Sequence, residues 1–191
     1  MYIQGSLKNY LDDLAARLPA PGGGSAAALT GALGAALISM VCNFTIGKEK
    51  YKNSEEQIKD ILSQSQRSRL RFMELLDLDV QAYQSKDLEK SLEVPLEVCR
   101  IAHHLSKACP ELVNIGNVNL ISDVGCAYDC LWAAFISARR NVDINLKNMG
   151  DITRKEGINY ELDKLEEEIK QLKIKVEENV GKVIRRQDYS I

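Results

Sequence analysis

The stretch from Pro19 to Tyr51, PAPGGGSAAALTGALGAALISMVCNFTIGKEKY, constrains the fold of this chain more than any other. Three consecutive glycines precede a segment from Ala26 to Ile46 that carries no charged residue. Such a segment can cross a membrane, follow a phosphate-binding loop, or form a helix that packs closely against other helices. Each structure requires different residues around it.

The uncharged segment is long enough to span a bilayer, because as a helix it measures roughly 30 Å. It is only moderately apolar, however, since alanine and glycine dominate and Thr30, Ser39 and Asn43 interrupt it. A helix at the centre of a soluble bundle has the same composition on all sides. Small residues such as Gly31 and Gly34 allow close helix contacts that offset the low helix propensity of glycine. We therefore predict a central, closely packed helix, and no membrane as a partner.

The glycine run, Gly22, Gly23 and Gly24, has two interpretations. Without Cβ atoms it allows a ligand to lie against the backbone, and Ser25 is a suitable N-cap for the following helix. The free N–H groups of a helix start can bind an anion or a carbonyl oxygen. A Walker A loop is excluded, because Gly47-Lys48 comes too late in the stretch. An ordinary helix start and a ligand-binding site both remain open on these residues.

Elsewhere, apolar residues recur every three or four positions, which indicates amphipathic helices, and no segment alternates with the period of a strand. The predicted helices run from Ile3 to Leu18, from the glycine run to about Thr45, from Ser54 to about Tyr83, from Pro95 to Pro110, from about Ser122 to Leu146, and from about Asn159 to Arg186. The pattern between Glu111 and Ser122 is less regular. We predict an all-α fold: a single-domain antiparallel helical bundle over residues 1–191, with a central helix of small residues and a long C-terminal helix. The apolar seam of that last helix suits a bundle edge or a dimer contact.

Composition narrows the function classes. The net charge of −2 provides no general attraction for nucleic acid. The five cysteines form no CxxC pair and the two histidines are adjacent, so we predict no metal site and reduced thiols in the cytoplasm. Asp12 and Asp13 lie where a secretory signal needs apolar residues, so we expect no such signal.

Five blocks in order resemble one family. They are PGGGS with its Ala/Gly-rich helix and TIGKEKY, then ELLDLDVQAY (Glu74–Tyr83), EVPLEV (Glu93–Val98), GNVNLISDVG (Gly116–Gly125) and NVDINL (Asn141–Leu146). Together they are similar to the cyclodeaminase domain of formiminotransferase-cyclodeaminase and to stand-alone methenyltetrahydrofolate cyclohydrolases. The resemblance implies a helical homodimer that acts on a reduced folate, a small molecule, and needs no metal or redox cofactor.

The resemblance also implies roles for particular residues. A proton must be moved at a cationic carbon, and Asp123 is the preferred catalytic group, with Asp79 a weaker candidate. Lys48 would pair with a substrate carboxylate or with Asp123. The remaining candidates would hold the substrate: Gly22, Gly23, Gly24, Ser25, Tyr51, Asn117, Asn119, Asn141 and Asn145. Asn141 and Asn145 are four positions apart, on one face of a helix.

Three functions remain open on the sequence. The first is hydrolysis of methenyltetrahydrofolate to the formyl derivative, favoured because the chain has no formiminotransferase domain. The second is the cyclodeaminase reaction at the same site, with release of ammonia. The third is a non-catalytic, folate-binding helical dimer, which the short connection from Gln84 to Leu92 suggests, since the family usually has a longer one.

Overall fold

The computed structural model describes residues 1–147 and 149–187, and in these ranges the chain is helical with no strand. The α-helices are α1 (Leu7–Ala15), α2 (Gly23–Asn43), α3 (Glu55–Ser85), α4 (Leu88–Ser106), α5 (Ala108–Ile115), α6 (Ile121–Lys147) and α7 (Ile152–Gln187). Three short 3-10 turns accompany them: η1 (Tyr2–Gln4), η2 (Glu49–Ser54) and η3 (Val118–Leu120). The predicted all-α class is confirmed.

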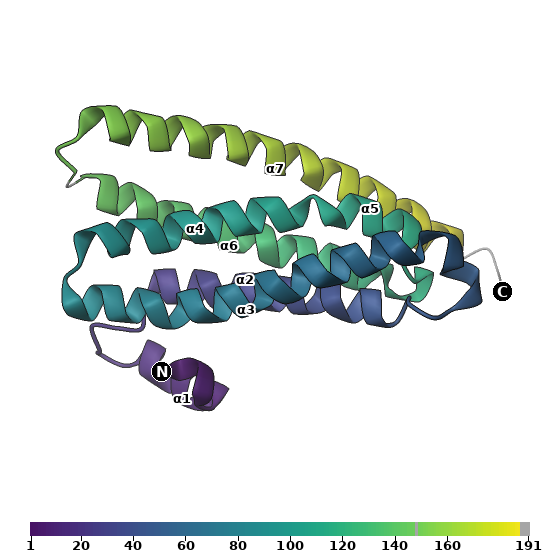
Figure 1. Ribbon diagram of the computed structural model, residues 1–191, viewed down its shortest axis with the longest axis horizontal. Helices are drawn as coiled ribbons and strands as arrows, with labels where there is room; N and C mark the ends of the chain where they lie inside the picture. Colours follow the sequence, from purple (N-terminus) through teal and green to yellow (C-terminus); the bar gives the residue numbers. More distant parts are fainter. Residues whose placement is uncertain (148, 188–191) are drawn as a thin grey trace.

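The long helices lie side by side along one axis and form an up-and-down bundle (Figure 1). Helix α2 packs mainly against α3 and α6, while α4 closes the bundle against α6 and α3. Helix α7 runs along the upper edge of the bundle, and α1 lies outside it, below one end (Figure 1). At that end α2 begins, α3 turns into α4, and α6 finishes.

The glycines of α2 are required by close neighbours. A Cβ atom at Gly31 would lie 2.7 Å from the ring of Phe72 in α3. A Cβ atom at Gly34 would lie 2.9 Å from the backbone oxygen of Ala127 in α6. Both distances are shorter than any normal contact, so only glycine allows α3 and α6 to approach α2 this closely. The predicted central helix of small residues is confirmed.

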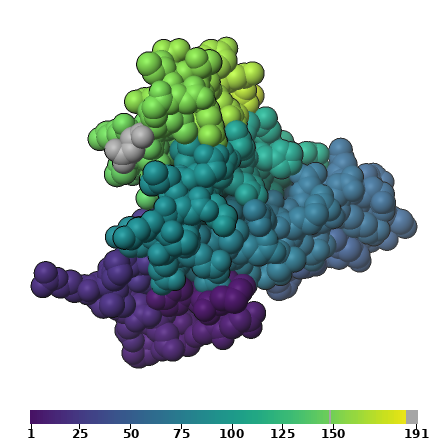
Figure 2. Space-filling view, turned by 60° about the vertical axis from the view of Figure 1, so that its left-hand side comes forward, coloured from purple at the N-terminus to yellow at the C-terminus, as the bar shows by residue number. Residues whose placement is uncertain are grey.

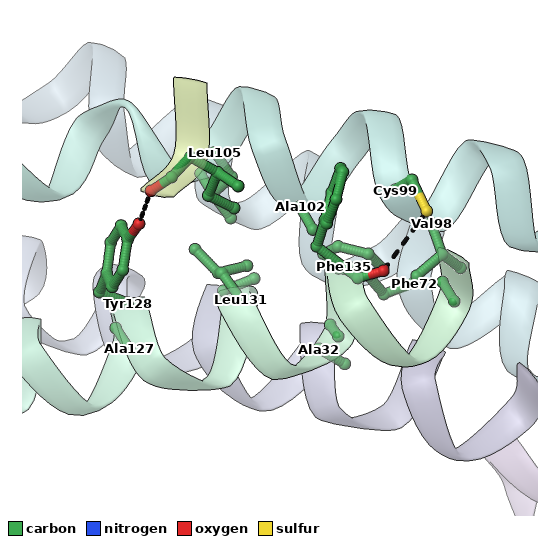
Figure 3. Close-up of a cluster of buried hydrophobic side chains, with 14 of the residues drawn as sticks. Ala32, Phe72, Val98, Cys99, Ala102, Leu105, Ala127, Tyr128, Leu131 and Phe135 are labelled. Atoms are coloured by element: carbon green, nitrogen blue, oxygen red, sulfur yellow. Dashed lines mark hydrogen bonds between the residues drawn. The ribbon is translucent and has the colours of Figure 1, made fainter. Parts of the chain in front are cut away.

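Large apolar side chains fill the space between α6, α3 and α4. Phe135 and Leu131 of α6 are fully buried, and Phe72 and Leu105 reach the same core from α3 and α4 (Figure 3). Tyr128 is also buried, and its hydroxyl donates a hydrogen bond to the backbone oxygen of Ile169 in α7 (Figure 3). The core therefore extends from α2 to the inner face of α7.

Ion pairs attach α7 to the bundle at the edges of this apolar contact. Arg100 of α4 binds Glu161 through two hydrogen bonds of 2.6 and 2.8 Å. Arg139 of α6 binds Glu166 at 2.7 Å. Such bidentate or multiple contacts fix orientation, while the buried apolar seam supplies most of the stabilisation.

The N-terminal segment packs against the bundle through polar anchors. The backbone N–H of Tyr2 donates to the buried carboxylate of Asp77 in α3 at 2.6 Å. Tyr10 of α1 is buried, and its hydroxyl lies 3.0 Å from the Ser25 hydroxyl at the start of α2. Figure 2 brings this end of the molecule forward and shows the segment in purple beneath the bundle. Helix α1 thus supports the beginning of α2.

Several predicted helix boundaries are wrong. Helix α1 spans Leu7–Ala15 rather than residues 3–18, α7 begins at Ile152 rather than near Asn159, and two further errors lie at prolines. Pro95 does not open the fourth helix but lies inside α4. Pro110 does not end that helix; α4 ends at Ser106, and Pro110 lies in the first turn of α5, where a missing N–H costs nothing. The segment read as irregular after Pro110 is therefore partly helical.

By length and composition alone, two helical segments of the described chain could cross a membrane: Gly23–Asn43 and Val118–Lys147. The sequence interpretation recognised only the first. In the most apolar window of the first, 61% of the residues are buried inside the bundle, against 39% for the second. Helices at the core of a bundle pass the same test.

Candidate active site

A pocket of about 290 Å³ opens at the end of the bundle where α2 begins. It is formed by parts of four helices and by the segment that leads into α2. Its lining residues are Pro19, Ala20, Gly22, Gly23, Gly24, Asp79, Tyr83, Ser91, Asn141, Ile144 and Asn145. Of the sequence candidates, it brings together the glycine run, Asp79, Asn141 and Asn145.

We expected the glycine run to form a loop before the helix, but in the structure it forms the start of the helix itself. Gly22 is the N-cap of α2 and Gly23 and Gly24 are already helical, which places Ser25 inside the first turn. Ser25 is therefore not the N-cap. Gly22 has no side chain to accept a hydrogen bond from the first N–H groups, so these groups are open to other partners.

Asp79 of α3 supplies that partner. Its Oδ2 accepts a hydrogen bond of 2.8 Å from the backbone N–H of Ser25. Its Oδ1 lies so close to Gly24 that a Cβ atom there would be 2.1 Å away. Burial raises the pKa of the Asp79 carboxyl, and the Ser25 N–H partly opposes this rise. A carboxylate with a raised pKa, at the wall of a pocket, is suited to accept and return a proton.

The two asparagines line the same pocket from the last turns of α6. Asn145 donates from Nδ2 to the backbone oxygen of Ser91 in α4 at 2.6 Å. Asn141 donates from Nδ2 to the oxygen of Ser137 at 2.8 Å and lies beside Gly23. Because carbonyl partners occupy the amide nitrogens, each Oδ1 remains an acceptor. The pocket therefore offers acceptor groups to a ligand that carries N–H groups.

Apolar side chains complete the walls. Tyr83 lies one turn after Asp79 on α3 and is 58% exposed, and Ile144 of α6 is 60% exposed. An exposed aromatic ring beside a hydrogen-bonding edge suits a flat, nitrogen-containing ring system.

The remaining candidates lie at the other end of the bundle, beyond the end of α2. Tyr51, Asn119 and Asp123 lie in η2, in η3 and at the start of α6. Lys48 and Asn117 are the residues that directly precede η2 and η3. The length of α2 separates them from the pocket by roughly 30 Å. Within one copy of the chain, these residues cannot contact a ligand in the pocket.

The contacts of this second group are structural. Asn117 is buried; its Nδ2 donates to the oxygen of Phe44 at 3.2 Å, and its backbone N–H donates to the Thr45 hydroxyl at 2.9 Å. The hydroxyl of Tyr51 accepts from the N–H of Val118 at 3.1 Å. Together these bonds connect the end of α2 to the start of α6.

The two charged candidates of the second group do not meet. Lys48 is exposed, and among the described residues of one copy no ion pair joins it to Asp123; its pairing with a substrate carboxylate stays a prediction. Asp123 lies in the first turn of α6, where the helix dipole favours an acidic residue.

Sequence reasoning ranked Asp79 below Asp123 and did not select Tyr83. Asp79 and Tyr83 belong to the ELLDLDVQAY block, and their spacing of four residues places them on one face of a helix. That spacing was the sequence signal that could have placed Asp79 and Tyr83 at one site. In the described ranges, 1–147 and 149–187, no group of three or more His, Cys, Asp and Glu side chains could hold a metal ion.

The pocket combines the Asp79 carboxylate with amide acceptors at the start of a glycine-rich helix. This combination is typical of an enzyme site for a small molecule with N–H groups. The formiminotransferase-cyclodeaminase family model matches residues 6–86 and 84–164. The chain belongs to this family.

Individual relatives agree. A methenyltetrahydrofolate cyclohydrolase of Methylorubrum extorquens is 35% identical over 169 residues, which cover 76% of this chain and 81% of that protein. The formimidoyltransferase-cyclodeaminase of Mus musculus is 29% identical over 188 residues, and the match spans only 35% of its length. A solved formiminotetrahydrofolate cyclodeaminase from Thermotoga maritima superposes with a TM-score of 0.89 at 31% identity, covering 94% of this chain and 97% of that one.

Proposed function

We propose that this protein is a folate one-carbon enzyme that hydrolyses methenyltetrahydrofolate to formyltetrahydrofolate. One observation carries the proposal: a carboxylate with a raised pKa, Asp79, lies against the bare backbone of Gly24 in a pocket lined with hydrogen-bond acceptors. The reduced pterin presents several N–H groups on a flat ring, which such a pocket can bind. The bacterial cyclohydrolase relative supports this reaction over others.

The geometry supports a proton-transfer mechanism. The methenyl carbon is part of a cationic amidinium, and the Asp79 carboxylate stabilises this charge when the ring system lies in the pocket. A water molecule attacks the carbon and gives its proton to Asp79, which acts as a general base. One C–N bond then breaks: the proton held by Asp79 passes to the leaving nitrogen, and the hydroxyl proton of the intermediate is released to solvent as the formyl C=O bond forms. No metal or redox cofactor takes part in these steps.

The cyclodeaminase reaction is the second candidate, favoured by the close structural match to the Thermotoga maritima enzyme. In that reaction the exocyclic amine nitrogen next to the pterin attacks the formimino carbon and gives its proton to Asp79, which passes the proton to the nitrogen that leaves as ammonia. The same side chains serve both reactions, so the substrate distinguishes them. A dimer that binds folate without turnover is the third candidate. The short α3–α4 connection favours it, because only Lys86 and Asp87 separate the two helices.

One set of assays separates the three functions. Methenyltetrahydrofolate is followed by its near-ultraviolet absorbance, and ammonia release is measured with formiminotetrahydrofolate. We expect loss of the methenyl signal that depends on enzyme concentration. Ammonia release without methenyl hydrolysis would assign the cyclodeaminase. A folate-induced rise in Tm without either turnover would assign a binding protein, and no response to any folate would refute all three.

We further propose that residues 1–191 act as one domain, in a cytoplasmic homodimer. One face of the bundle, formed by α2 and α6, supports the dimer. It exposes the small or apolar residues Leu33 (54%), Ala36, Cys126 and Ala133, and Asp129 is the one charged residue exposed between the last two. A second copy packed antiparallel on this face would bring the start of one α2 near the end of the other. Lys48 and Asp123 could then act only on the pocket of the partner.

A further inference from the structure

Pro95 lies in the interior of α4, where proline is unusual. It is buried, and three or more residues of the helix lie on either side of it. In an α-helix the N–H of residue 95 would bond to the carbonyl oxygen of Ser91, four positions earlier. Proline has no N–H, and its ring pushes that carbonyl away from the helix axis. The Ser91 oxygen is thereby left without its partner within the helix.

Another helix supplies the missing donor. Nδ2 of Asn145, from α6, donates to the Ser91 oxygen at 2.6 Å. A carbonyl can face only the nitrogen end of the amide, so this bond fixes the orientation of the Asn145 side chain. Its Oδ1 is then left free on the wall of the pocket that Ser91 and Asn145 both line.

We infer that Pro95 is a positioning residue of this site: by leaving the Ser91 oxygen free, it holds the Asn145 amide with Oδ1 available to an N–H group of the ligand. Pro95 itself does not line the pocket and acts only through Ser91 and Asn145. The role in ligand binding rests on the proposed function, whereas the coupling between Pro95 and Asn145 does not.

A second proline provides the contrast. Pro110 lies in the first turn of α5, where the N–H groups have no partner within the helix. Its missing N–H therefore frees no carbonyl oxygen. If Pro95 served only to shape the backbone, its replacement would not change the effect of a substitution at Asn145.

A thermal double-mutant cycle tests the coupling without any substrate. Asn145→Ala in the natural background leaves the Ser91 oxygen unpaired, and we expect Tm to fall by about 4 °C or more. In the Pro95→Ala background the new N–H of residue 95 bonds to Ser91, so Asn145→Ala should lower Tm by less than half as much. Equal shifts in the two backgrounds would show that the Ser91 oxygen serves both donors independently, and would overturn the inference.

Steady-state kinetics with methenyltetrahydrofolate then test the positioning role. Pro95→Ala and Asn145→Ala should each raise KM by about 3- to 10-fold, the effect of one hydrogen bond, with kcat little changed. The double variant should raise KM no further than the larger single effect. Pro110→Ala is the matched control and should leave KM unchanged.

The two tests separate failure of the inference from failure of the proposed function. Unchanged KM in Pro95→Ala, alongside a raised KM in Asn145→Ala, would overturn the positioning role. If the protein turned over neither folate substrate, the proposed function would fail while a coupled thermal cycle still supported the Pro95–Asn145 relationship. In that case the role of the Asn145 Oδ1 would be tested by measuring the Kd of a reduced folate, and we expect weaker binding to Pro95→Ala.

Discussion

Asp79 of α3 caps the start of α2 by accepting a hydrogen bond from the backbone N–H of Ser25, at 2.8 Å across 54 residues of sequence. Helix starts are usually capped by a side chain from their own first residues. Here Gly22 occupies that position and has none. The same carboxylate therefore both closes the helix and faces the pocket.

Replacement of Asp79 should abolish most of the activity. Asp79→Asn keeps an oxygen for the Ser25 N–H but cannot accept a proton, so we expect kcat to fall by about 10²- to 10⁴-fold. Asp123→Asn, at the far end of α2, is the comparison, measured with the same methenyltetrahydrofolate assay. A large loss in Asp123→Asn with normal activity in Asp79→Asn would show that the pocket assignment is wrong.

The pH dependence of stability should be unusual at Asp79. Its pKa is raised in the folded state by burial, so the folded protein binds this proton more tightly than the unfolded chain does. The stabilisation is fully present below the unfolded pKa of about 3.9 and is lost as the pH rises through the folded pKa. At pH 7 the ionised Asp79 therefore destabilises the fold relative to an asparagine.

Urea unfolding at several pH values measures this effect. Asp79→Asn should be more stable than the natural protein at pH 7, and the difference should shrink as the pH falls towards 4. A variant less stable at pH 7, with a difference that shrinks in acid, would mean that the folded pKa is depressed instead.

Addition of a methyl group at Gly24 should displace Asp79. The new Cβ would lie 2.1 Å from Oδ1, so the carboxylate would have to move and weaken its bond to Ser25. We expect Gly24→Ala to lose about 1–3 kcal/mol of unfolding free energy, together with activity. Gly22→Ala is the control for stability, since a Cβ there meets no atom within 4 Å. Equal losses of stability in both variants would contradict the proposed contact.

A charge on the α2–α6 face should separate the proposed dimer. Leu33 is 54% exposed at the middle of that face, and burial of an unpaired arginine in an interface is costly. Leu33→Arg should sediment as a monomer. Ile174→Arg, at a residue 60% exposed on α7, should sediment like the natural protein. If the natural protein is itself a monomer at micromolar concentration, the homodimer proposal fails.

The sequence predicted the fold well because the long helices other than α2 have an apolar period, and because α2, built of small residues on all sides, could pack in few ways. The boundaries at Pro95 and Pro110 were wrong, because a proline can lie inside a helix when another residue binds the carbonyl that it frees. No local pattern shows that Asn145, on another helix, does so for Ser91.

The candidate site was only half predictable. The glycine run, Asn141 and Asn145 meet in the pocket, because α2 begins where α6 ends. Asp123 and Lys48 were grouped with them from the family resemblance, which gives no information on distance within one copy of the chain. Asp79 could be placed at the pocket wall only once its contact with Ser25 was known.

Assembly of the pocket from distant segments has a consequence for how activity is regained after denaturation. The Asp79–Ser25 and Asn145–Ser91 bonds each join residues 54 positions apart, so no isolated hairpin of the chain contains both. Turnover after dilution from urea should therefore return with the last long-range contacts and lag behind the recovery of helical circular dichroism. Recovery of turnover would thus measure when the last long-range contacts of the fold have formed.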